Sequence, residues 1–455
     1  MEAEFYTATT KSRNYGYTGE NIIKKAQYGT SKELNENGDG IPTLRLNEIK
    51  DTFISEKPAK FCSKLSDTEI KSLYLQKGDV LICRTNGNAN YVGRSGIVME
   101  NMHYVFASYL YRIIPDLEKI NSETLVAFLN SKYGREQINK QSMQSNQVNF
   151  SPAKFRKIDI PKIDTKIQNT IANMYSIAYT NIQNASNKYS QAENLLISEL
   201  GLENFNPSNE KVSIKTLKES FLKTGRLDSE YYQPKYDDYL KKVFSYKNGY
   251  ELLGKCCTIK DKNFMPKDDE EYCYIELANV RSNAQITDCN ILLGKELPTR
   301  ARRKVNTGDV IVSSIEGSLE SCALITEEHN NSLCSTGFYV VNSEKLNAES
   351  LLTVFKSSLM LNLMKKGCSG TILTNISKEE FAKLPIPLLK QDVQDEITSY
   401  IKQSMEYSKK AKDLLNISAE AVEIAIDKDE ETAQNYLDRQ TDRQTDRQTD
   451  RQTDR

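Results

Sequence analysis

The chain has 455 residues, of which 38% are hydrophobic and 27% are charged, and its formal net charge at pH 7 is −1. This length allows about two to four domains, and the composition is ordinary for a soluble protein. No run of about 18 apolar residues occurs, and the N-terminus lacks the pattern of a signal peptide, so neither a membrane span nor secretion is predicted. Because the charge is nearly balanced, any basic surface for nucleic acid must be local.

The nine cysteines and two histidines do not follow the spacing of metal sites. No pair of cysteines has the C-x-x-C pattern, and neither His103 nor His329 stands near a cluster of cysteines or carboxylates with zinc spacing. The cysteines are therefore expected to be reduced thiols of a cytoplasmic protein, with the adjacent Cys256 and Cys257 buried. The sequence predicts no metal and no cofactor.

Residues 1–164 alternate short apolar runs with turn residues, as a mixed α and β domain does. Asn-Gly and Asp-Gly pairs within 35–40 predict a hairpin-type loop before a strand over 41–49, and residues 272–280 alternate in the same way in the second half of the chain. A Gly-Asp turn at 78–79 precedes another β-rich run, and a polar loop over 83–94 follows it. Loops on a rigid frame are where binding specificity usually lies.

The stretch 165–200 contains no glycine or proline and carries mainly apolar residues every three or four positions. These positions are Ile167, Ile171, Met174, Ala178, Ile182, Ala185, Tyr189, Ala192 and Leu196. The spacing predicts one helix, roughly 54 Å long, with a stripe of the coiled-coil type. Shorter helices are expected before it at 121–133 and, in the second half of the chain, at 347–365.

The second half of the chain repeats the first at an offset of 226 positions. Pro161 and Gln168 recur as Pro387 and Gln394, ahead of a second predicted helix over 391–426. The other matches are Asn149-Phe150-Ser151 with Asn375-Ile376-Ser377, and residues 1–6 with residues 227–232. The chain is therefore predicted to contain two copies of one module, each a globular part that ends in a long helix.

The two copies differ in their loops and in the second apolar stripe. The run Lys77–Ile82 recurs as Thr307–Val312 at an offset of 230, so loop lengths differ before this point while the frame repeats. The second stripe is weaker because Ser404, Ser408 and Ser418 occupy three of its positions.

From Asp427 the chain is highly charged, and from Asp438 it repeats the order DRQT. Such a segment is predicted to be disordered. The order Thr-Asp-Arg-Gln is also what the tetranucleotide ACAG encodes in triplets, and every forward frame of such a tract gives the same four residues. We hypothesise that the gene contains such an ACAG tract and that changes in its length shift the reading frame beyond it. Mixed synonymous codons across 438–455 would exclude this mechanism.

No pattern of an active site is found. The spacing from Gly87 to Gly93 has five intervening residues instead of the four of a phosphate loop, and Arg94 stands where that loop requires lysine. Neither the base-holding tetrapeptide of amino-methyltransferases nor a glycine-rich signature for a methyl-donor cofactor occurs. The chain is therefore predicted not to be an enzyme.

Polar loops and basic clusters are the candidates for a binding function. Arg, Asn, Ser and Thr side chains can read base edges in the major groove, and Arg and Lys can contact phosphates. The candidate DNA-binding residues are Arg84, Thr85, Asn86, Asn88 and Arg94 on the first polar loop, Lys154 and Arg156 after Phe150, the cluster Arg300, Arg302 and Arg303, and Ser314 on the second polar loop, 313–321. Arg84 and Asn86 are expected to read one half-site, and the arginine cluster to contact phosphate at the other. The alternative for each residue is a solvated surface.

With the repeat laid out, the chain resembles the specificity (S) subunits of type I restriction-modification systems. The segments that carry this resemblance are 28–49, 75–98, 226–236 and 335–341, together with the Ile/Leu-Pro segments before Gln168 and Gln394. The resemblance implies two target-recognition domains that each bind half of a split site in double-stranded DNA. It also implies two helices packed antiparallel as a spacer, docking of two DNA methyltransferase subunits and a restriction (translocase) subunit, and no catalytic activity in this chain.

The predicted fold class is α+β, with an internal pseudo-two-fold duplication. Target-recognition domains over 1–164 and 227–390 are separated by two long antiparallel coiled-coil helices over 165–200 and 391–426, and 201–226 is the linker. The predicted function is that of a non-catalytic, cytoplasmic DNA specificity subunit with no membrane partner. One alternative is the DNA-recognition subunit of a type IIB-like enzyme, whose partner combines both catalytic activities. An alternative of another class is a helical scaffold protein with no nucleic-acid role; a self-sufficient methyltransferase would require a cofactor site that the sequence lacks.

Overall fold

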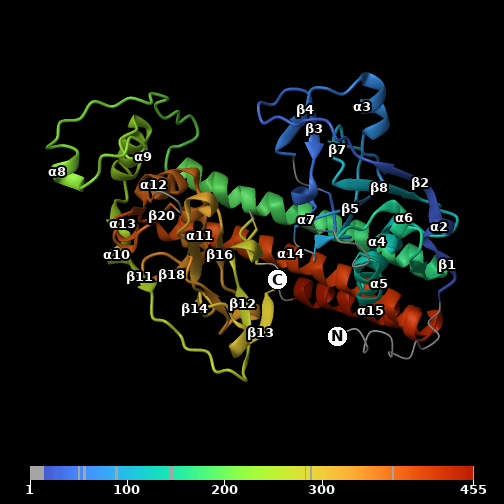
Figure 1. The fold of residues 1–455 in the computed structure, drawn as a ribbon. Coiled ribbons are helices and arrows are strands. Elements are labelled where there is room, and N and C mark those ends of the chain that lie inside the picture. Colours follow the sequence, from blue (N-terminus) through green and yellow to red (C-terminus); the bar gives the residue numbers. More distant parts are fainter. Residues whose placement is uncertain are drawn as a thin grey trace. The chain divides into compact units, whose positions relative to one another are not determined.

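The computed structural model describes residues 15–49, 52–54, 58–87, 91–142, 148–281, 283–286, 289–370 and 374–453 (Figure 1). The chain folds into two compact units, and each takes residues from both long helices. Unit 1 comprises Met1–Ile182 and Ser408–Arg455, and unit 2 comprises Gln183–Tyr407. Within the described ranges, no helix is long and apolar enough to cross a membrane.

The core of unit 1 is built on an antiparallel four-stranded sheet in the order β2-β8-β5-β6. Its strands are β2 (Ile23–Tyr28), β8 (Leu110–Pro115), β5 (Val80–Cys83) and β6 (Ser95–Ile97). A second sheet in the order β4-β3-β7 pairs β3 antiparallel with β4 and parallel with β7. The remaining elements before the long helix are β1 (Tyr17–Thr18), α2 (Gly19–Ile22), β3 (Ile41–Leu44), η1 (Leu46–Glu48), β4 (Lys60–Cys62), α3 (Asp67–Leu73), β7 (Val105–Phe106), α4 (Ser122–Asn130), α5 (Lys132–Ser142), α6 (Pro152–Phe155) and β9 (Asp159–Ile160).

Unit 2 contains a four-stranded sheet with the corresponding order, β11-β18-β15-β16. Its strands are β11 (Cys257–Lys260), β18 (Phe338–Ser343), β15 (Val310–Ser313) and β16 (Cys322–Leu324). Its second sheet, β13-β12-β17-β14, has one strand more than that of unit 1. The other elements are α8 (Phe221–Thr224), α9 (Pro234–Phe244), β10 (Tyr250–Leu252), α10 (Leu253–Cys256), β12 (Glu271–Ile275), η3 (Leu277–Asn279), β13 (Asn290–Leu293), η4 (Gly294–Glu296), β14 (Ala301–Lys304), η5 (Glu316–Ser318), η6 (Glu327–His329), β17 (Leu333–Ser335), α11 (Ala348–Lys356), α12 (Ser358–Gly367), β19 (Cys368–Ser369), β20 (Asn375–Ile376), α13 (Lys378–Ala382) and β21 (Pro385–Pro387).

The Gly-Asp turn before the central strand has the same geometry in both copies. Gly78 and Gly308 have φ values of 90° and 87°, in the left-handed region that favours glycine. The carboxylate of the next residue closes each turn: Asp79 accepts a hydrogen bond from the backbone N–H of Gln76 at 2.9 Å, and Asp309 accepts from Asn306 N–H at 2.9 Å. The repeat predicted from the sequence is therefore present at the level of single hydrogen bonds.

The long helices are α7 (Thr165–Glu199) and α14 (Gln391–Asp427), close to the predicted bounds. In unit 2, the Ser404 hydroxyl donates to the carbonyl oxygen of Ala185 at 2.7 Å, and the Lys188 ammonium lies 5.3 Å from the centre of the Tyr400 ring. Residue numbers thus rise along one helix as they fall along its neighbour, so the segments within this unit are antiparallel.

The same direction holds within unit 1, where Ser418 Oγ lies 3.7 Å from Met174 Sδ and the Asp164 N–H donates to Glu430 at 2.8 Å. Most stripe positions of both helices are buried. Those below a tenth exposed are Ile167, Ile171, Met174, Ala178, Ala185, Tyr189, Ala192 and Leu196 on α7, and Val393, Ile397, Ser404, Ala411, Ser418 and Val422 on α14. Burial of this surface is the main source of helix stability.

The prediction of a disordered end from 427 is wrong for the described part, because α15 (Glu430–Thr453) is helical. Ala433 and Leu437 are fully buried in the core of unit 1, and Tyr436 packs against the same core. Their spacing of three and four residues makes a short apolar face within the charged sequence. Asp429 caps the helix, since its carboxylate accepts the Thr432 N–H at 2.7 Å.

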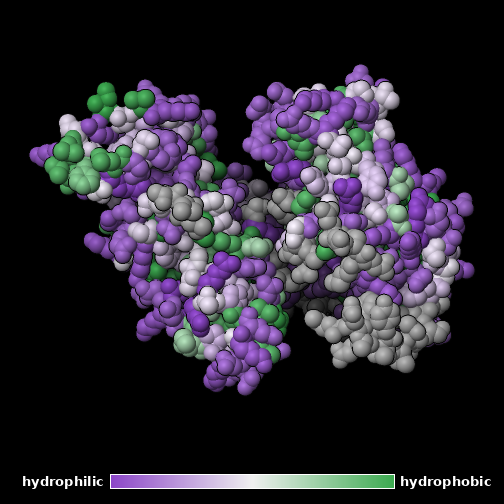
Figure 2. Space-filling view, in the orientation of Figure 1, coloured by the Kyte–Doolittle hydropathy of each residue, from purple (hydrophilic) through white to green (hydrophobic). Residues whose placement is uncertain are grey.

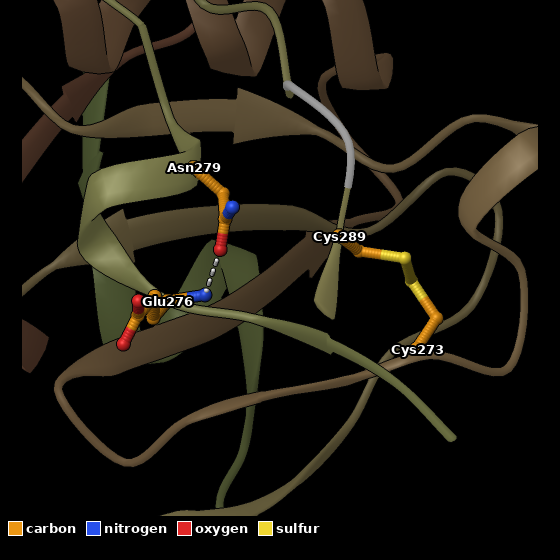
Figure 3. Close-up of a disulfide and its surroundings, with 4 residues drawn as sticks. All are labelled: Cys273, Glu276, Asn279 and Cys289. Atoms are coloured by element: carbon orange, nitrogen blue, oxygen red, sulfur yellow. Dashed lines mark hydrogen bonds between the residues drawn. A yellow bond between two sulfur atoms is a disulfide. The ribbon is translucent and has the colours of Figure 1, made fainter. Parts of the chain in front are cut away.

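The strands predicted over 41–49 and 272–280 are shorter than expected. β3 ends at Leu44 and β12 at Ile275, and each is followed by a single 3₁₀ turn. In each turn a side chain binds the backbone three residues earlier: Glu48 accepts the Arg45 N–H at 2.7 Å, and Asn279 accepts the Glu276 N–H at 2.9 Å (Figure 3). Such local side-chain bonds compete with strand pairing.

The prediction that all cysteines are reduced is also wrong, because Cys273 and Cys289 form a disulfide (Figure 3). Cys273 lies on β12 and pairs in register with Ile291 of β13, so the adjacent strands bring the two cysteines together. Spacing along the sequence does not reveal this pairing. Cys256 is buried as predicted, and Cys257 is half-buried.

Candidate nucleic-acid interface

The first polar loop leaves β5 at Arg84 and is tied to the frame at both ends. The Arg84 N–H donates to Tyr109 O, and the Phe150 N–H donates to Arg84 O, both at 2.8 Å. At the other end, the Cys83 N–H donates to Arg94 O at 2.8 Å. The two described ends of the loop are therefore anchored to the frame, which limits the entropy lost when the side chains of Arg84 and Arg94 bind a partner.

Two guanidinium groups of this loop lie against tyrosine rings. The Arg84 guanidinium carbon is 5.5 Å from the centre of the Tyr28 ring, and that of Arg94 is 3.9 Å from the centre of the Tyr91 ring. Such cation–π contacts hold an arginine without neutralising its charge. The Arg94 charge, added to the larger effect of burial, lowers the pKa of Arg135 beside it. A positive, hydrogen-bonding surface results.

The other candidates near this loop have intramolecular partners. Lys154 Nζ donates to the carbonyl oxygens of Asn149 at 3.0 Å and Ser142 at 3.5 Å, and burial lowers its pKa. Arg156 pairs with Glu20 at 2.5 Å. Asn149 also forms an isolated β-bridge with Thr85 of the first polar loop. Lys154 is therefore linked to this loop through Asn149. Asn88 lies outside the described residues, and Thr85 and Asn86 are half-buried.

The arginine cluster of the second copy lies on and before β14, at the edge of its sheet. Arg300 is exposed, Arg302 Nε donates to Thr299 O at 3.0 Å, and Arg303 donates to Asn263 Oδ1 at 2.7 Å. Arg303 also donates to the carbonyl oxygen of Asp261. These bonds fix the guanidinium groups of Arg302 and Arg303 while leaving donors for a further acceptor, since each guanidinium carries five N–H groups.

Ser314 stands at the same backbone position as Arg84. The Ser314 N–H donates to Gly337 O and the Ile376 N–H donates to Ser314 O, both at 2.9 Å, as at the first polar loop. The Thr336 N–H donates to Arg300 O at 2.8 Å, which brings the arginine cluster next to this loop. The Ser314 side chain is buried, however, and its hydroxyl donates to Gly337 O at 2.9 Å. The frame is repeated, but the side chain that it presents differs.

Exposed aromatic residues that the sequence did not predict lie around the first polar loop. Tyr28 is 46% exposed and Tyr109 is 51% exposed, and both neighbour Arg84 through the contacts described above. With 25 tyrosines in the chain, no spacing distinguishes these two from core tyrosines such as Tyr111. Exposed aromatic rings beside arginines are suited to stacking on bases or sugars.

Figure 2 shows a face made mainly of hydrophilic residues with small hydrophobic patches, one of them over α8. In unit 1, a groove of about 720 Å³ lies among α7, α14 and α15, with Met174, Ile177 and Leu414 among its lining residues. It is separate from the polar loop. In the described part of the chain, no group of three or more His, Cys, Asp or Glu residues could hold a metal.

Comparison with known proteins decides the family of the second copy. Residues 240–416 match the family model of the type I restriction modification DNA specificity domain. This chain carries such a domain. The matched region runs from the second half of α9 through most of α14, including β14, the Ser314 loop and Gln394.

Over 84 residues, the chain is 31% identical to the type I restriction enzyme EcoKI specificity subunit of Escherichia coli (strain K12). The matched stretch covers 18% of this chain and 18% of that subunit. Together with the specificity domain, this match confirms the predicted resemblance to specificity subunits.

Solved structures of such subunits are also similar, over most of their length. The S subunit from M. genitalium is 11% identical with a TM-score of 0.40, over 91% of this chain and 96% of that one. The HsdS subunit from Thermoanaerobacter tengcongensis is 12% identical with a TM-score of 0.28, over 92% and 98%.

Proposed function

We propose that the chain is a non-catalytic DNA specificity subunit that recognises a bipartite sequence in double-stranded DNA. One observation carries this proposal: the two copies hold different side chains, Arg84 and Ser314, on the same hydrogen-bonded frame. A protein that reads two different half-sites requires such an arrangement. The specificity domain over 240–416 supports it independently.

In this function, 1–164 and 227–390 are the target-recognition domains, and 201–226 links them. The helices over 165–200 and 391–426 are the spacer that relates the two half-sites, in a pseudo-two-fold arrangement. Support for the spacer role comes from the antiparallel pairing of helix segments inside each unit and from burial of their stripes.

We assign base recognition in the first half-site to Arg84 and Asn86, with Thr85, Asn88 and Arg94 on the same loop. Arg300, Arg302 and Arg303 contact phosphate at the second half-site. Lys154 supports the first polar loop through its bond to the Asn149 carbonyl oxygen, Arg156 is held by its ion pair with Glu20, and Ser314 contributes through its place in the frame. Arginine is the commonest base-reading residue because its fork matches guanine O6 and N7.

The partners in this function are DNA methyltransferase subunits and a restriction (translocase) subunit, which supply the catalytic activities. The groove among α7, α14 and α15 is a suitable docking place in unit 1, because apolar Met174, Ile177 and Leu414 lie within a polar rim. A protein that acts on chromosomal DNA with these partners works in the cytoplasm.

The test is DNA binding by the purified chain with its methyltransferase subunits, using the site identified by sequencing methylated DNA. We expect Arg84→Ala to cost about 1–3 kcal/mol in binding and to relax one position of one half-site. Arg302→Ala should weaken all sequences alike and lower the salt slope by roughly one unit. Arg439→Ala on α15 is the matched control and should change neither quantity. Binding that is insensitive to sequence and to salt would contradict the proposed function.

A further inference from the structure

Gln168, in the first turn of α7, is 8% exposed and uses its whole amide group in hydrogen bonds. Its Nε2 donates to Ile163 O at 2.8 Å and to Lys119 O at 3.2 Å, and its Oε1 accepts the Asn121 N–H at 2.7 Å. A surface glutamine would exchange these bonds for water at little cost, whereas a buried one cannot. Gln168 thus ties the start of the long helix to the loop before α4.

Asn121 returns a bond to the same residue. Its Nδ2 donates to the carbonyl oxygen of Gln168 at 2.9 Å, while its Oδ1 caps α4 by accepting the Thr124 N–H at 2.8 Å. The first turns of α4 and α7 therefore share one side-chain network. We call the bonds between Asn121 and Gln168, with their equivalents in the second copy, the glutamine junction.

The glutamine junction is connected to the first polar loop through the protein frame. Ser122, the first residue of α4, donates from Oγ to Gly78 O at 2.6 Å, in the turn that begins β5. β5 ends at Cys83, directly before Arg84. A continuous path of short-range bonds thus runs from the start of the long helix to the loop assigned to base recognition.

The second copy repeats the glutamine junction bond for bond, with Gln394 only 4% exposed. Gln394 Nε2 donates to Leu389 O at 2.9 Å and to Lys345 O at 3.1 Å, and its Oε1 accepts the Asn347 N–H at 2.9 Å. Asn347 Nδ2 donates to Gln394 O at 3.3 Å. Every partner lies 226 positions after its counterpart, although the sheet β13-β12-β17-β14 of unit 2 has one strand more than the sheet β4-β3-β7 of unit 1.

We propose that Gln168 and Gln394 are positioning residues that set the separation between half-sites which the protein accepts. Each fixes the direction of a long helix against its own recognition domain. This inference rests on the proposed function and adds to it a specificity determinant that does not touch DNA. The same partners recur in both copies, although the second sheets of the two units differ in strand number and the two polar loops present different side chains.

The geometry makes the separation sensitive to this junction. The part of α7 within unit 1, from Thr165 to Ile182, spans roughly 27 Å at 1.5 Å per residue. A tilt of about 7° at its start moves its far end by about 3 Å, close to the rise of about 3.4 Å per base pair in DNA. Small angular freedom at the junction therefore translates into a change of one base pair in spacer length.

The experiment measures binding of the complex with its methyltransferase subunits to a DNA library in which both half-sites are constant and the spacer varies. The wild-type complex should prefer one spacer. Gln168→Met keeps the size of the side chain but removes its three hydrogen bonds, and should reduce discrimination against spacers one base pair longer or shorter by about tenfold or more. Gln394→Met should do the same, and exposed Gln191→Met on α7 is the matched control.

Asn121→Ser provides a milder variant in case the buried change impairs folding. Serine still caps α4 but cannot donate to the Gln168 carbonyl, so we expect a smaller loss of spacer discrimination in the same direction. Unchanged spacer preference in folded Gln168→Met and Asn121→Ser would overturn the inference, as would a change in the half-site bases themselves. A wild-type complex that binds no bipartite site would instead overturn the proposed function.

Discussion

The two copies keep a buried aspartate in the same turn but neutralise it with cations from different strands. In the first copy, Asp79 pairs with Arg112 of β8 at 2.8 Å, and both side chains are almost fully buried. In the second copy, Asp309 pairs with Lys260 of β11 at 2.7 Å, and the lysine is about a third exposed.

The strand registers show that this is an exchange across one strand pair. Arg112 faces Gln27 across the first sheet, and Val340 faces Lys260 at the equivalent place in the second. The cation thus moved to the neighbouring strand while the aspartate and its turn stayed. The difference teaches that the frame requires a charge at one point in space, whereas the residue that supplies it is free to change.

The largest expected effect comes from removing the cation of the first copy. Arg112→Val leaves Asp79 buried without its partner and should destabilise unit 1 by about 3–5 kcal/mol. Adding Gln27→Lys transplants the arrangement of the second copy and should recover a large part of that loss. Chemical denaturation with hydrogen-exchange mass spectrometry measures both. A double variant no more stable than the single one would show that the two arrangements are not interchangeable.

The next difference between the copies is the disulfide Cys273–Cys289, which has no counterpart in the described sheet β4-β3-β7 of unit 1. With a separation of 16 residues, the oxidised form should exceed the Cys289→Ser variant in stability by about 3 kcal/mol. Thermal unfolding with and without reductant measures this difference in stability. Hydrogen exchange of the backbone amides of β3 is the internal control, because β3 lies in unit 1 and should not respond to the reductant. If protein purified without reductant titrates with nine free thiols, the disulfide is not present in solution.

A smaller difference lies in the stripes of the long helices, where Ser404 replaces the equivalent Ala178. Its hydroxyl donates to Ala185 O on the neighbouring helix segment, so Ser404→Ala should cost about 0.5–1.5 kcal/mol in unfolding free energy. Thr180→Ala on α7 is the control, because that exposed hydroxyl donates to Ser176 O within its own helix. Its loss should be close to neutral. Equal effects of the two changes would contradict a special role for the bond between helices.

The smallest effect concerns Lys356 at the end of α11, which stands where α4 has Asn130. Lys356 Nζ donates to Glu320 O at 2.9 Å, and burial lowers its pKa. Between that lowered value and the unfolded value of about 10.4, the unfolded state binds more protons, so the unfolding free energy rises with pH. Lys356→Asn should lack this rise, whereas Lys365→Asn on α12, whose side chain is 44% exposed, should keep it. If the unfolding free energies of wild type and Lys356→Asn change equally between pH 7.5 and 10, the lowered pKa of Lys356 is not the source of the rise.

Repetition and periodicity made much of this fold predictable. The stripes gave the long helices nearly to the residue, and the fixed offset between Gln168 and Gln394 marked a position that proves to be a buried junction. The offset of 230 at the Gly-Asp turns located the strands that carry the polar loops. Each of these signals is local or periodic, so one sequence suffices to find it.

Features that depend on three-dimensional neighbours were not predictable in this way. The pairing of Cys273 with Cys289 needs the register of β12 against β13, and the exposure of Tyr28 needs the position of β2 in its sheet. Ser314 was predicted to bind DNA from the second polar loop, yet its hydroxyl is turned inward and donates to Gly337 O. The helix α15 escaped notice because two buried residues, Ala433 and Leu437, are too few to outweigh a charged composition.

The division of both long helices between the units has a consequence for folding during synthesis. The core of unit 1 includes Ala411, Val422 and Leu437, which the ribosome adds only after all of Gln183–Tyr407. At about 5–20 residues per second, that delay is roughly 10 to 45 s. Throughout it, the apolar stripe of α7 from Ile167 to Ala178 lacks its partner and is available to chaperones or to another nascent chain. The domain that is translated first is therefore the one completed last.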